Sequence, residues 1–119
     1  MTEAMYPPMT REIAQMRRAF APETQAAFDT FSRKVFAEGA LSAKMKQIVA
    51  VAVAHVTQCP YCITGHTKAA RRAGATQEEL MEAIWVAAEM QAGAAYAHST
   101  LALATFGKDE AKQKTPSGE

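Results

Sequence analysis

Apolar residues recur at three- and four-residue intervals along this chain, the spacing that places side chains on one face of an α-helix. Thr10 can cap a first helix that ends at about Phe20, and Pro22 suits the first turn of a second helix that stops near Gly39. The apolar faces of these two helices consist of Ile13, Met16, Phe20, Phe28, Phe31, Val35 and Phe36.

The middle of the chain predicts two further helices. Ser42 can cap a third helix over 43–56. The alternation of valine and alanine over Val49–Ala54 is also compatible with a strand, but the cap, the length and an alanine at every second position favour a helix. A fourth helix is expected to begin at Cys59-Pro60 and to end at Ala73-Gly74.

The last part of the chain opens with the clearest helix start, a capping box formed by Thr76 and Glu79. We expect Gly93 to bend or break the fifth helix and a sixth to run to about Phe106. The residues of the fifth helix predicted to face the core are Leu80, Ile84, Ala87 and Ala88. The sequence therefore predicts an all-α fold, a compact domain of about six helices.

A single domain accounts for residues 1–119, because 12.9 kDa is an ordinary size for one domain. We expect its core at about 10–107, with flexible ends at 1–9 and 108–119. Alanine is abundant and aromatic residues make up 8% of the chain, so the core of a monomer would be thin. A homo-oligomer is therefore expected, which would cover the apolar positions Phe28, Phe31, Trp85 and Tyr96.

The charge balance excludes some classes of partner. A formal net charge of +1 gives no electrostatic reason to expect nucleic acid or a membrane surface. No apolar run is long enough to span a membrane, and the first residues lack the pattern of a signal peptide. We therefore expect a cytoplasmic protein in a reducing compartment, where structural disulfides are rare.

The motif that carries chemistry is Cys59-Pro60-Tyr61-Cys62, followed by His66. On a helix, the spacing i, i+3 and i+7 places Cys59, Cys62 and His66 on one face. A helix N-terminus stabilises a thiolate, which is the reactive form of cysteine, and His66 can take the thiol proton or hold the thiolate by charge. The pair is thus equipped for oxidation of one sulfur to sulfenic acid and disulfide closure by the other.

Other interpretations of these residues remain open. The cysteines can be two small buried side chains on an alanine-rich helix. They can also be half of a zinc site completed by His55 and His66, although this spacing is uncommon for zinc and the chain has no second cysteine pair. We expect no metal and no cofactor. His55 is expected to pack near the site, and His98 to lie in the core or an interface.

Either thiol can be the nucleophile. Cys59 is nearer the helix N-terminus and feels the stronger dipole, worth about 0.3–1 kcal/mol. Cys62 lies four residues before His66, and a charge-assisted hydrogen bond to an imidazolium contributes about 1.5–3 kcal/mol. The comparison favours Cys62 as the attacking thiol, with its pKa moderately lowered.

Three segments, Leu41–Ala50, Cys59–Cys62 with His66, and Arg72–Thr76, resemble the carboxymuconolactone decarboxylase family and, within it, the alkylhydroperoxidase D (AhpD-like) branch. The resemblance covers about Phe28–Phe106. Its motif, a glutamate twelve residues before Cys-x-x-Cys-x-x-x-His, fixes several residue types at set distances. The resemblance implies an AhpD-like helical domain that assembles as a trimer or hexamer.

The same resemblance implies a role for each residue of the motif. Cys62 corresponds to the thiol that attacks peroxide, Cys59 to the resolving thiol and His66 to the histidine of a proton relay. Tyr61 stands at a position that can be histidine in the family, so that part of the relay is absent.

Gln47 stands at the position of the family's glutamate. An amide can form hydrogen bonds, but it cannot accept a proton or offset the charge of an imidazolium. Glu38 or Glu89 can supply the carboxylate only if the fold brings one of them close. Without it, we expect weak peroxidase turnover or thiol exchange.

The function predicted from the sequence is that of a thiol-dependent oxidoreductase, an alkylhydroperoxidase-like enzyme that reduces hydroperoxides through a Cys59–Cys62 disulfide. Its reductant would be a dithiol, either a lipoyl group or a thioredoxin-like protein. One alternative is a redox-responsive helical oligomer without turnover. Another is lactone decarboxylation, which is disfavoured because it has no evident need for two thiols.

Overall fold

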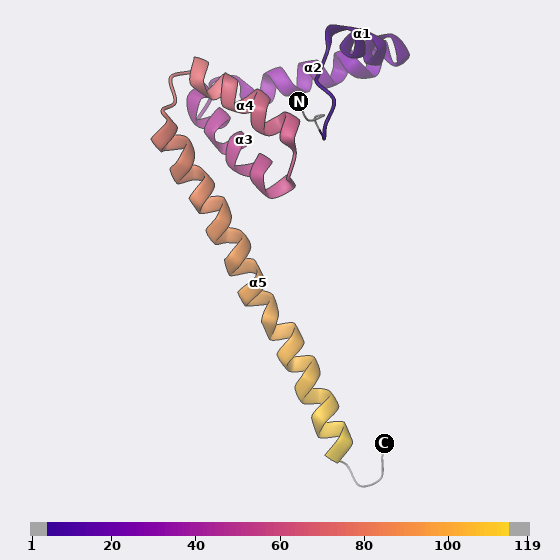
Figure 1. The fold of residues 1–119 in the computed structure, drawn as a ribbon, viewed down its shortest axis with the longest axis vertical. Helices are drawn as coiled ribbons and strands as arrows, with labels where there is room; N and C mark the ends of the chain where they lie inside the picture. The colour runs from indigo at the N-terminus through magenta and orange to yellow at the C-terminus, as the bar shows by residue number, and fades with distance from the viewer. Residues whose placement is uncertain (1–4, 115–119) are drawn as a thin grey trace.

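Five α-helices make up the part of the chain that the structure, a computed structural model, describes, residues 5–114 (Figure 1). They are α1 (Arg11–Phe20), α2 (Pro22–Phe36), α3 (Ala43–Thr57), α4 (Pro60–Arg72) and α5 (Gln77–Lys114). These described residues contain no strand, so the predicted all-α fold is confirmed. The stretches 1–4 and 115–119, which belong to the ends predicted to be flexible, lie outside the described residues.

Side-chain caps start three of the helices at the predicted residues. The hydroxyls of Thr10 and Ser42 accept backbone N–H groups from the first turns of α1 and α3, at 3.2 and 3.0 Å. At α5 the N–H of Glu79 donates to the hydroxyl of Thr76 at 3.1 Å, and the N–H of Thr76 donates to the Glu79 carboxylate at 2.9 Å. This reciprocal pair confirms the predicted capping box.

A tight turn joins α3 to α4 and places the cysteine motif. Gln58 adopts a left-handed backbone conformation, with φ 58°, and the N–H of Cys59 donates to the carbonyl of Ala54 at 3.1 Å. Pro60 then occupies the first turn of α4, where its fixed φ and missing N–H are tolerated. The chain therefore reverses, α4 packs along α3, and Cys59 lies at the helix start.

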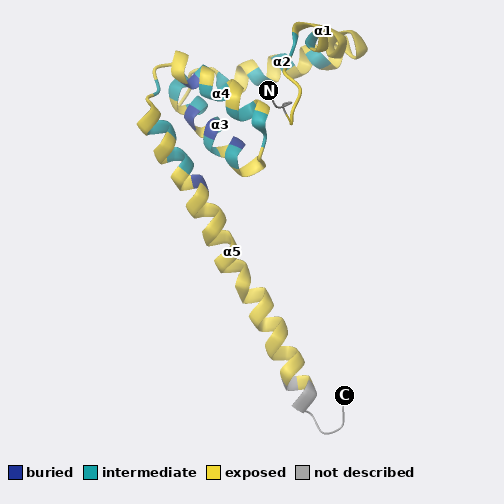
Figure 2. Ribbon diagram, viewed as in Figure 1, coloured by how far each residue is buried: buried dark blue, intermediate teal, exposed yellow. Residues whose placement is uncertain are grey.

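The core is small and lies where α3 packs against α4 and the first turns of α5 (Figure 2). Its buried residues are Ile48, Val51, Ala54, Ala70 and Ala87. Most of these are alanine, which buries little area per side chain, so the predicted thin core is confirmed. Ala88, which we expected to face the core, is exposed.

The last helix differs from the sequence prediction, because α5 is continuous. We expected Gly93 to bend or break the fifth helix and a sixth helix to end at about Phe106, but α5 runs unbroken through both residues to Lys114, beyond the predicted core limit at 107. A glycine inside a helix costs roughly 0.5–1 kcal/mol. The alanines on either side are the best helix formers, so they sustain the helix through this position. Five helices are therefore present in the described residues instead of about six.

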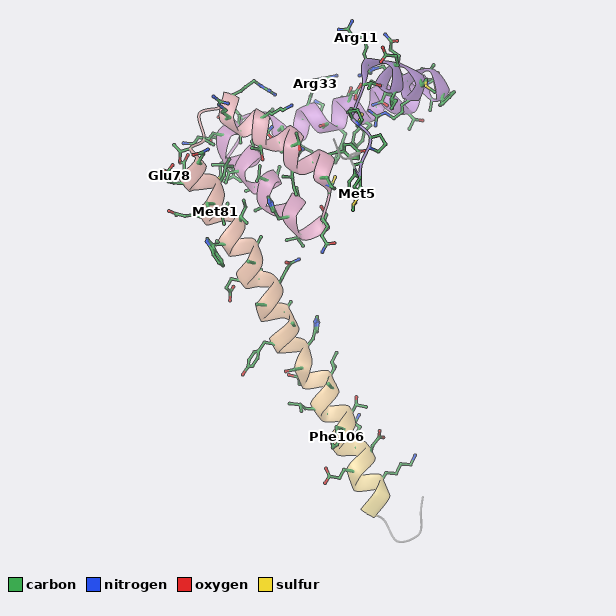
Figure 3. All side chains as sticks on the ribbon, viewed as in Figure 1. Met5, Arg11, Arg33, Glu78, Met81 and Phe106 are labelled. Atoms are coloured by element: carbon green, nitrogen blue, oxygen red, sulfur yellow. The ribbon has the colours of Figure 1, made fainter. Side chains whose placement is uncertain are left out.

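Beyond its first turns, α5 extends away from the other helices. Every side chain from Ala88 to Glu110 is exposed, and apolar ones such as Phe106 project into solvent (Figures 2 and 3). The radius of gyration is 22.1 Å, against about 13–14 Å for a compact chain of this length. Although α5 is long, neither it nor any other helix within residues 5–114 is apolar enough to cross a membrane.

Candidate functional site

The two cysteines are free thiols at the start of α4, and both are half-buried. Cys59 is the residue before the helix, and its Sγ accepts the backbone N–H of Cys62 at 3.2 Å. A sulfur thus takes the capping place that a serine, threonine or aspartate oxygen commonly fills. Cys62 lies within the first turn, as the spacing of the motif predicts.

The hydrogen bonds at the helix start separate the two thiols. The thiol of Cys62 and the backbone N–H groups of Cys62 and Tyr61 donate to Cys59 and lower its pKa. The pKa of Cys62 is raised, first because its S–H donates to Cys59, then by burial and by repulsion from the Cys59 thiolate. The sequence predicted a lowered pKa for Cys62. In the structure, the first thiol to ionise is Cys59, and Cys62 holds the shared proton.

His66 is fixed by two neighbours from other helices. Its Nδ1 lies 2.8 Å from Oε1 of Gln47 on α3, and its ring stacks on Phe36 of α2, with centroids 5.1 Å apart and planes at 26°. An amide oxygen only accepts hydrogen bonds, so Nδ1 carries the proton. In the neutral ring Nε2 is then an acceptor, which can take a proton from a neighbouring group.

A cavity of about 470 Å³ opens at this point between α2, α3 and α4. Its walls are formed by Ser32, Arg33, Phe36, Gln47, Tyr61, Cys62, Gly65, His66 and Ala69. Cys62 is therefore the cysteine that faces the cavity, whereas Cys59 is not among the residues that line it. The fold brings Gln47 of α3 to Cys62 and His66 of α4, although Gln47 lies 19 residues before His66 in the sequence.

The remaining histidines lie outside this cavity. The Nδ1 of His55 forms a hydrogen bond of 2.7 Å with the carbonyl of Val51, so the ring is bound to the backbone of its own helix, α3. His98 is exposed on the far part of α5 and is not a core residue in this chain. Within the described residues, no three His, Cys, Asp or Glu side chains gather as candidate metal ligands.

Neither glutamate proposed as a substitute for the family's carboxylate reaches the site. Glu38 accepts the backbone N–H of Ala43 at 3.1 Å and so helps to cap α3. Glu89 is exposed on α5 and does not line the cavity. Gln47 therefore stands alone as the partner of Nδ1 of His66, with no acidic residue among those that form the cavity wall.

Sequence reasoning missed the contribution of α2 to the site. Ser32, Arg33 and Phe36 line the cavity, yet only Phe36 was singled out, as an apolar residue of its helix. Their spacing shows that they share one side of α2. The spacing does not show which helix that side faces, so no local pattern connects them to the cysteine motif.

Tyr61 connects the site to the segment before α1. Its hydroxyl donates to the carbonyl of Pro7 at 2.7 Å, and the Tyr6 ring meets its ring edge-on at a centroid distance of 5.7 Å. A second cavity of about 550 Å³ lies between this segment and α4, and Tyr61 and Gly65 line both cavities. Part of the end predicted to be flexible thus lies against α4, the helix that begins at the cysteine motif.

Several known proteins are related to this chain in sequence. A profile of the carboxymuconolactone decarboxylase family matches residues 22–105. A protein of Paracoccus denitrificans described as "Uncharacterized protein 4 in cox locus" is 57% identical over 106 residues, which cover 89% of this chain and 95% of that protein. An uncharacterized protein of Cupriavidus necator is 34% identical over 85 residues, covering 71% of this chain and 75% of its own.

Two solved structures share the fold. A carboxymuconolactone decarboxylase family protein from Legionella pneumophila, in its apo form, superposes with a TM-score of 0.62 at 33% identity, covering 68% of this chain and 75% of that one. A protein from Methanobacterium thermoautotrophicum gives a TM-score of 0.66 at 34% identity, covering 70% and 93%. The profile match spans most of the chain, and it includes the cavity and the cysteine motif. The chain therefore belongs to the carboxymuconolactone decarboxylase family.

Proposed function

We propose that this protein is a thiol-dependent oxidoreductase of the AhpD-like kind, which reduces hydroperoxides through a disulfide between Cys59 and Cys62. The observation that carries the proposal is the gathering of Cys62, His66 and Gln47 in one cavity, with Cys59 hydrogen-bonded to Cys62. A nucleophile, a base and a second thiol are the groups that a dithiol peroxidase needs.

In the first step, Cys62 is the attacking thiol. Its proton passes to Nε2 of His66, the acceptor nitrogen of the neutral ring, which becomes an imidazolium. The Cys62 sulfur then attacks the terminal oxygen of the hydroperoxide. The O–O bond breaks, Cys62 becomes a sulfenic acid, and the alkoxide leaves as an alcohol after it takes the proton from the imidazolium.

In the second step, Cys59 attacks the sulfur of the Cys62 sulfenic acid. The S–S bond forms, and the departing hydroxide takes from solvent the proton that Cys59 released when it ionised, so that it leaves as water. Overall, one hydroperoxide and two thiols yield one alcohol, one water and one disulfide. An external dithiol, either a lipoyl group or a thioredoxin-like protein, then restores both thiols by exchange. This step requires only a small approach of the two sulfurs, because they lie one helical turn apart.

The experiment that tests the proposal is a thiol titration before and after one equivalent of organic hydroperoxide, with mass analysis of the peptide that contains both cysteines. We expect both thiols to disappear and the peptide to lose two hydrogens. Turnover with dihydrolipoamide should consume many equivalents of peroxide, and Cys62→Ser should abolish it. If both thiols remain titratable after mild peroxide treatment, the proposal is wrong.

The same assay separates the alternatives. A redox-responsive oligomer without turnover would lose both thiols once and consume no further peroxide when the dithiol is present. A lactone decarboxylase would consume a carboxylated lactone at a rate that does not depend on whether the cysteines are reduced. To identify the attacking thiol, a sulfenic-acid probe is applied to Cys59→Ser and Cys62→Ser. Label on Cys62 in the first variant is expected, whereas label on Cys59 in the second at the wild-type rate would reverse the assignment.

We further propose that the working unit is a homo-oligomer, with trimers or hexamers as the expected sizes. The chain exposes 9831 Å², whereas a compact monomer of this mass exposes about 6,300 Å². The difference, about 3,500 Å², exceeds what one chain covers in most obligate dimers. More than one interface per chain is therefore expected, which a trimer or hexamer provides.

A further inference from the structure

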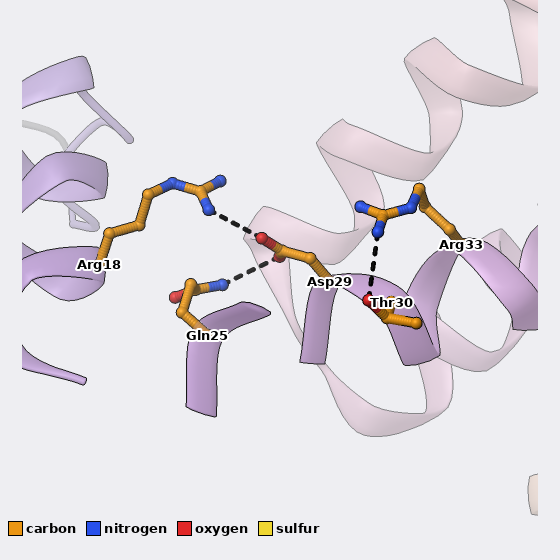
Figure 4. A network of polar contacts seen from close by, with 5 residues as sticks. All are labelled: Arg18, Gln25, Asp29, Thr30 and Arg33. Carbon is orange, nitrogen blue, oxygen red and sulfur yellow. Dashed lines mark hydrogen bonds and ion pairs between the residues drawn. The ribbon is translucent and has the colours of Figure 1, made fainter. Parts of the chain in front are cut away.

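One cation in the cavity wall lacks a carboxylate partner. Arg33 of α2 lines the cavity together with Cys62 and His66. Its guanidinium donates a hydrogen bond of 3.2 Å to the hydroxyl of Thr30 (Figure 4). This hydroxyl is neutral and does not offset the charge of the guanidinium. Within the described residues, no carboxylate lies at ion-pair distance from Arg33.

The nearest acidic group on the same helix is already occupied. Both oxygens of Asp29 accept hydrogen bonds, one from Arg18 at 2.7 Å and the other from Gln25 at 3.0 Å (Figure 4). These bonds, the charge of Arg18 and, more weakly, the charge of Arg33 hold the pKa of Asp29 below its usual range, so the carboxylate stays ionised and forms its ion pair with Arg18. Arg33 thus brings a positive charge, without an ion pair among the described residues, to a cavity whose wall contains no acidic residue.

We propose that Arg33 binds the anionic group of the substrate, so that the hydroperoxides preferred by this protein carry a carboxylate. This inference rests on the proposed function for the reaction, but the anion site itself does not. A guanidinium presents a fixed fork of N–H donors that matches a carboxylate, and it cannot be deprotonated in proteins.

The rest of the cavity suits the other end of such a molecule. The rings of Phe36 and Tyr61 and the methyl of Ala69 offer apolar surface, while Cys62 lies in the same wall. A volume of about 470 Å³ accommodates a small organic acid. A substrate whose carboxylate lies on Arg33 and whose hydrocarbon part contacts the rings would direct its hydroperoxide to Cys62.

The test compares two alkylating reagents that differ by a charge, anionic iodoacetate and neutral iodoacetamide, in a Cys59→Ser background where only Cys62 reacts. We expect Arg33→Gln to lower the ratio of the iodoacetate rate to the iodoacetamide rate by about fivefold to tenfold. Arg33→Lys should retain part of the preference, and added salt should lower the ratio only while Arg33 is present.

Arg11→Gln is the matched control, because it removes the same charge from the start of α1, away from the cavity (Figure 3). Its ratio should equal that of the parent. If Arg33→Gln changes the ratio of the iodoacetate rate to the iodoacetamide rate no more than Arg11→Gln does, Arg33 does not form an anion site. This conclusion holds whatever the peroxidase assay shows.

A second measurement tests the substrate class. Steady-state kinetics with a hydroperoxide that carries a carboxylate, and with its methyl ester, should give a higher kcat/KM for the acid, and Arg33→Gln should remove that difference. Equal values for acid and ester in the wild-type protein would overturn the substrate assignment. A lowered alkylation ratio without any peroxide consumption would retain the anion site and reject the proposed function.

Discussion

The hydrogen bond between His66 and Gln47 sets how far the site can activate a thiol. A glutamine oxygen fixes which ring nitrogen carries the proton, but it adds no negative charge to hold an imidazolium. In the proposed reaction, the protonated ring is the form that delivers a proton to the departing alkoxide. The amide therefore orients the histidine without strengthening it as an acid–base group.

Replacement of Gln47 by glutamate should increase the rate at which Cys62 reacts with hydroperoxide. A carboxylate 2.8 Å from Nδ1 would stabilise the imidazolium through a charge-assisted hydrogen bond. Such bonds exceed neutral ones by about 1–1.5 kcal/mol, so the reaction of Cys62 with hydroperoxide at pH 7 should accelerate about tenfold. Stopped-flow measurement of sulfenic acid or disulfide formation gives the rate.

Two further variants control this prediction. Gln47→Met keeps a similar volume but removes the hydrogen bond, so its rate should fall below that of the wild type. Gln91→Glu adds the same charge on an exposed position of α5 and should leave the rate unchanged. An equal rate in Gln47→Glu and Gln91→Glu would show that the charge at residue 47 does not act through His66.

The shared proton of the cysteines predicts opposite pKa shifts in two single variants. Cys62→Ala removes the S–H that lowers the pKa of Cys59, so that pKa should rise, with the backbone N–H groups left as donors. Cys59→Ala removes both the acceptor and the charge that raise the pKa of Cys62, so that pKa should fall. The pH dependence of alkylation by iodoacetamide measures both.

In pH terms, the wild-type protein should ionise in two steps. Cys59 becomes a thiolate at the lower pH, and Cys62 remains a thiol until the pH rises further. The single variants should each show one step that lies between these two. Midpoints in the variants that coincide with the wild-type steps would contradict the shared proton.

At this scale the sequence predicted the cysteine motif and its histidine but not their surroundings. Cys62 and His66 lie on one side of α4 and line the same cavity, as helix geometry predicts, whereas Cys59 is the residue before the helix and does not line that cavity. Residue spacing could not show which of the two cysteines has the lower pKa, because that depends on which sulfur donates the hydrogen bond and which accepts it. Arg33 and Phe36 reach the site through packing between helices, which no spacing within α2 encodes.

Among the elements, the start of α5 is held by both a capping box and an ion pair to another helix. The capping box of Thr76 and Glu79 satisfies backbone donors, and Lys44 of α3 forms an ion pair with Glu79 at 3.0 Å. This contact joins α5 to α3 at the edge of the small core. Loss of the cap should therefore loosen the helix where it packs on the rest of the chain.

Thr76→Ala removes the hydroxyl that accepts the N–H of Glu79, and should destabilise the protein by about 0.5–2 kcal/mol. Urea unfolding followed by circular dichroism measures the change. Thr100→Ala, the same substitution at an exposed position inside α5, should be neutral or slightly stabilising, because alanine is the better helix former. Equal destabilisation by both substitutions would contradict the cap.

Helix starts were predictable because they depend on side chains a few residues apart. Thr10, Ser42 and Thr76 all act as expected. The continuity of α5 was not predictable in this way. It depends on whether the low helix propensity of Gly93 outweighs the high propensity of the many alanines around it. The left-handed conformation of Gln58 could not be predicted from the sequence either, because glycine or asparagine is the usual residue at such a helix end.

At the scale of the whole molecule, the exposed part of α5, residues 88–110, is the feature that favours association with another chain. An isolated helix in water gains little from its own hydrogen bonds, and most helices in proteins depend on packing of an apolar face. Tyr96 is 83% exposed and Leu103 is 72% exposed, on one side of this helix. The helices before it also expose apolar side chains, among them Phe28 and Phe31. In the proposed homo-oligomer, these two sets of apolar side chains would face each other across the contact between copies.

If copies of the chain cover α5, a charge on its apolar side should break the assembly. Leu103→Asp should convert the homo-oligomer to smaller species, because an unpaired carboxylate is costly to bury in an apolar contact. Thr105→Asp is the matched control, since two residues along a helix the side chain points away from the side of Leu103 and Tyr96. Light scattering at micromolar concentration measures both, with the wild-type protein expected well above the 12.9 kDa of one chain. A wild-type particle of monomer mass would refute the assembly, and equal dissociation by both substitutions would mean that the contact does not use this side of α5.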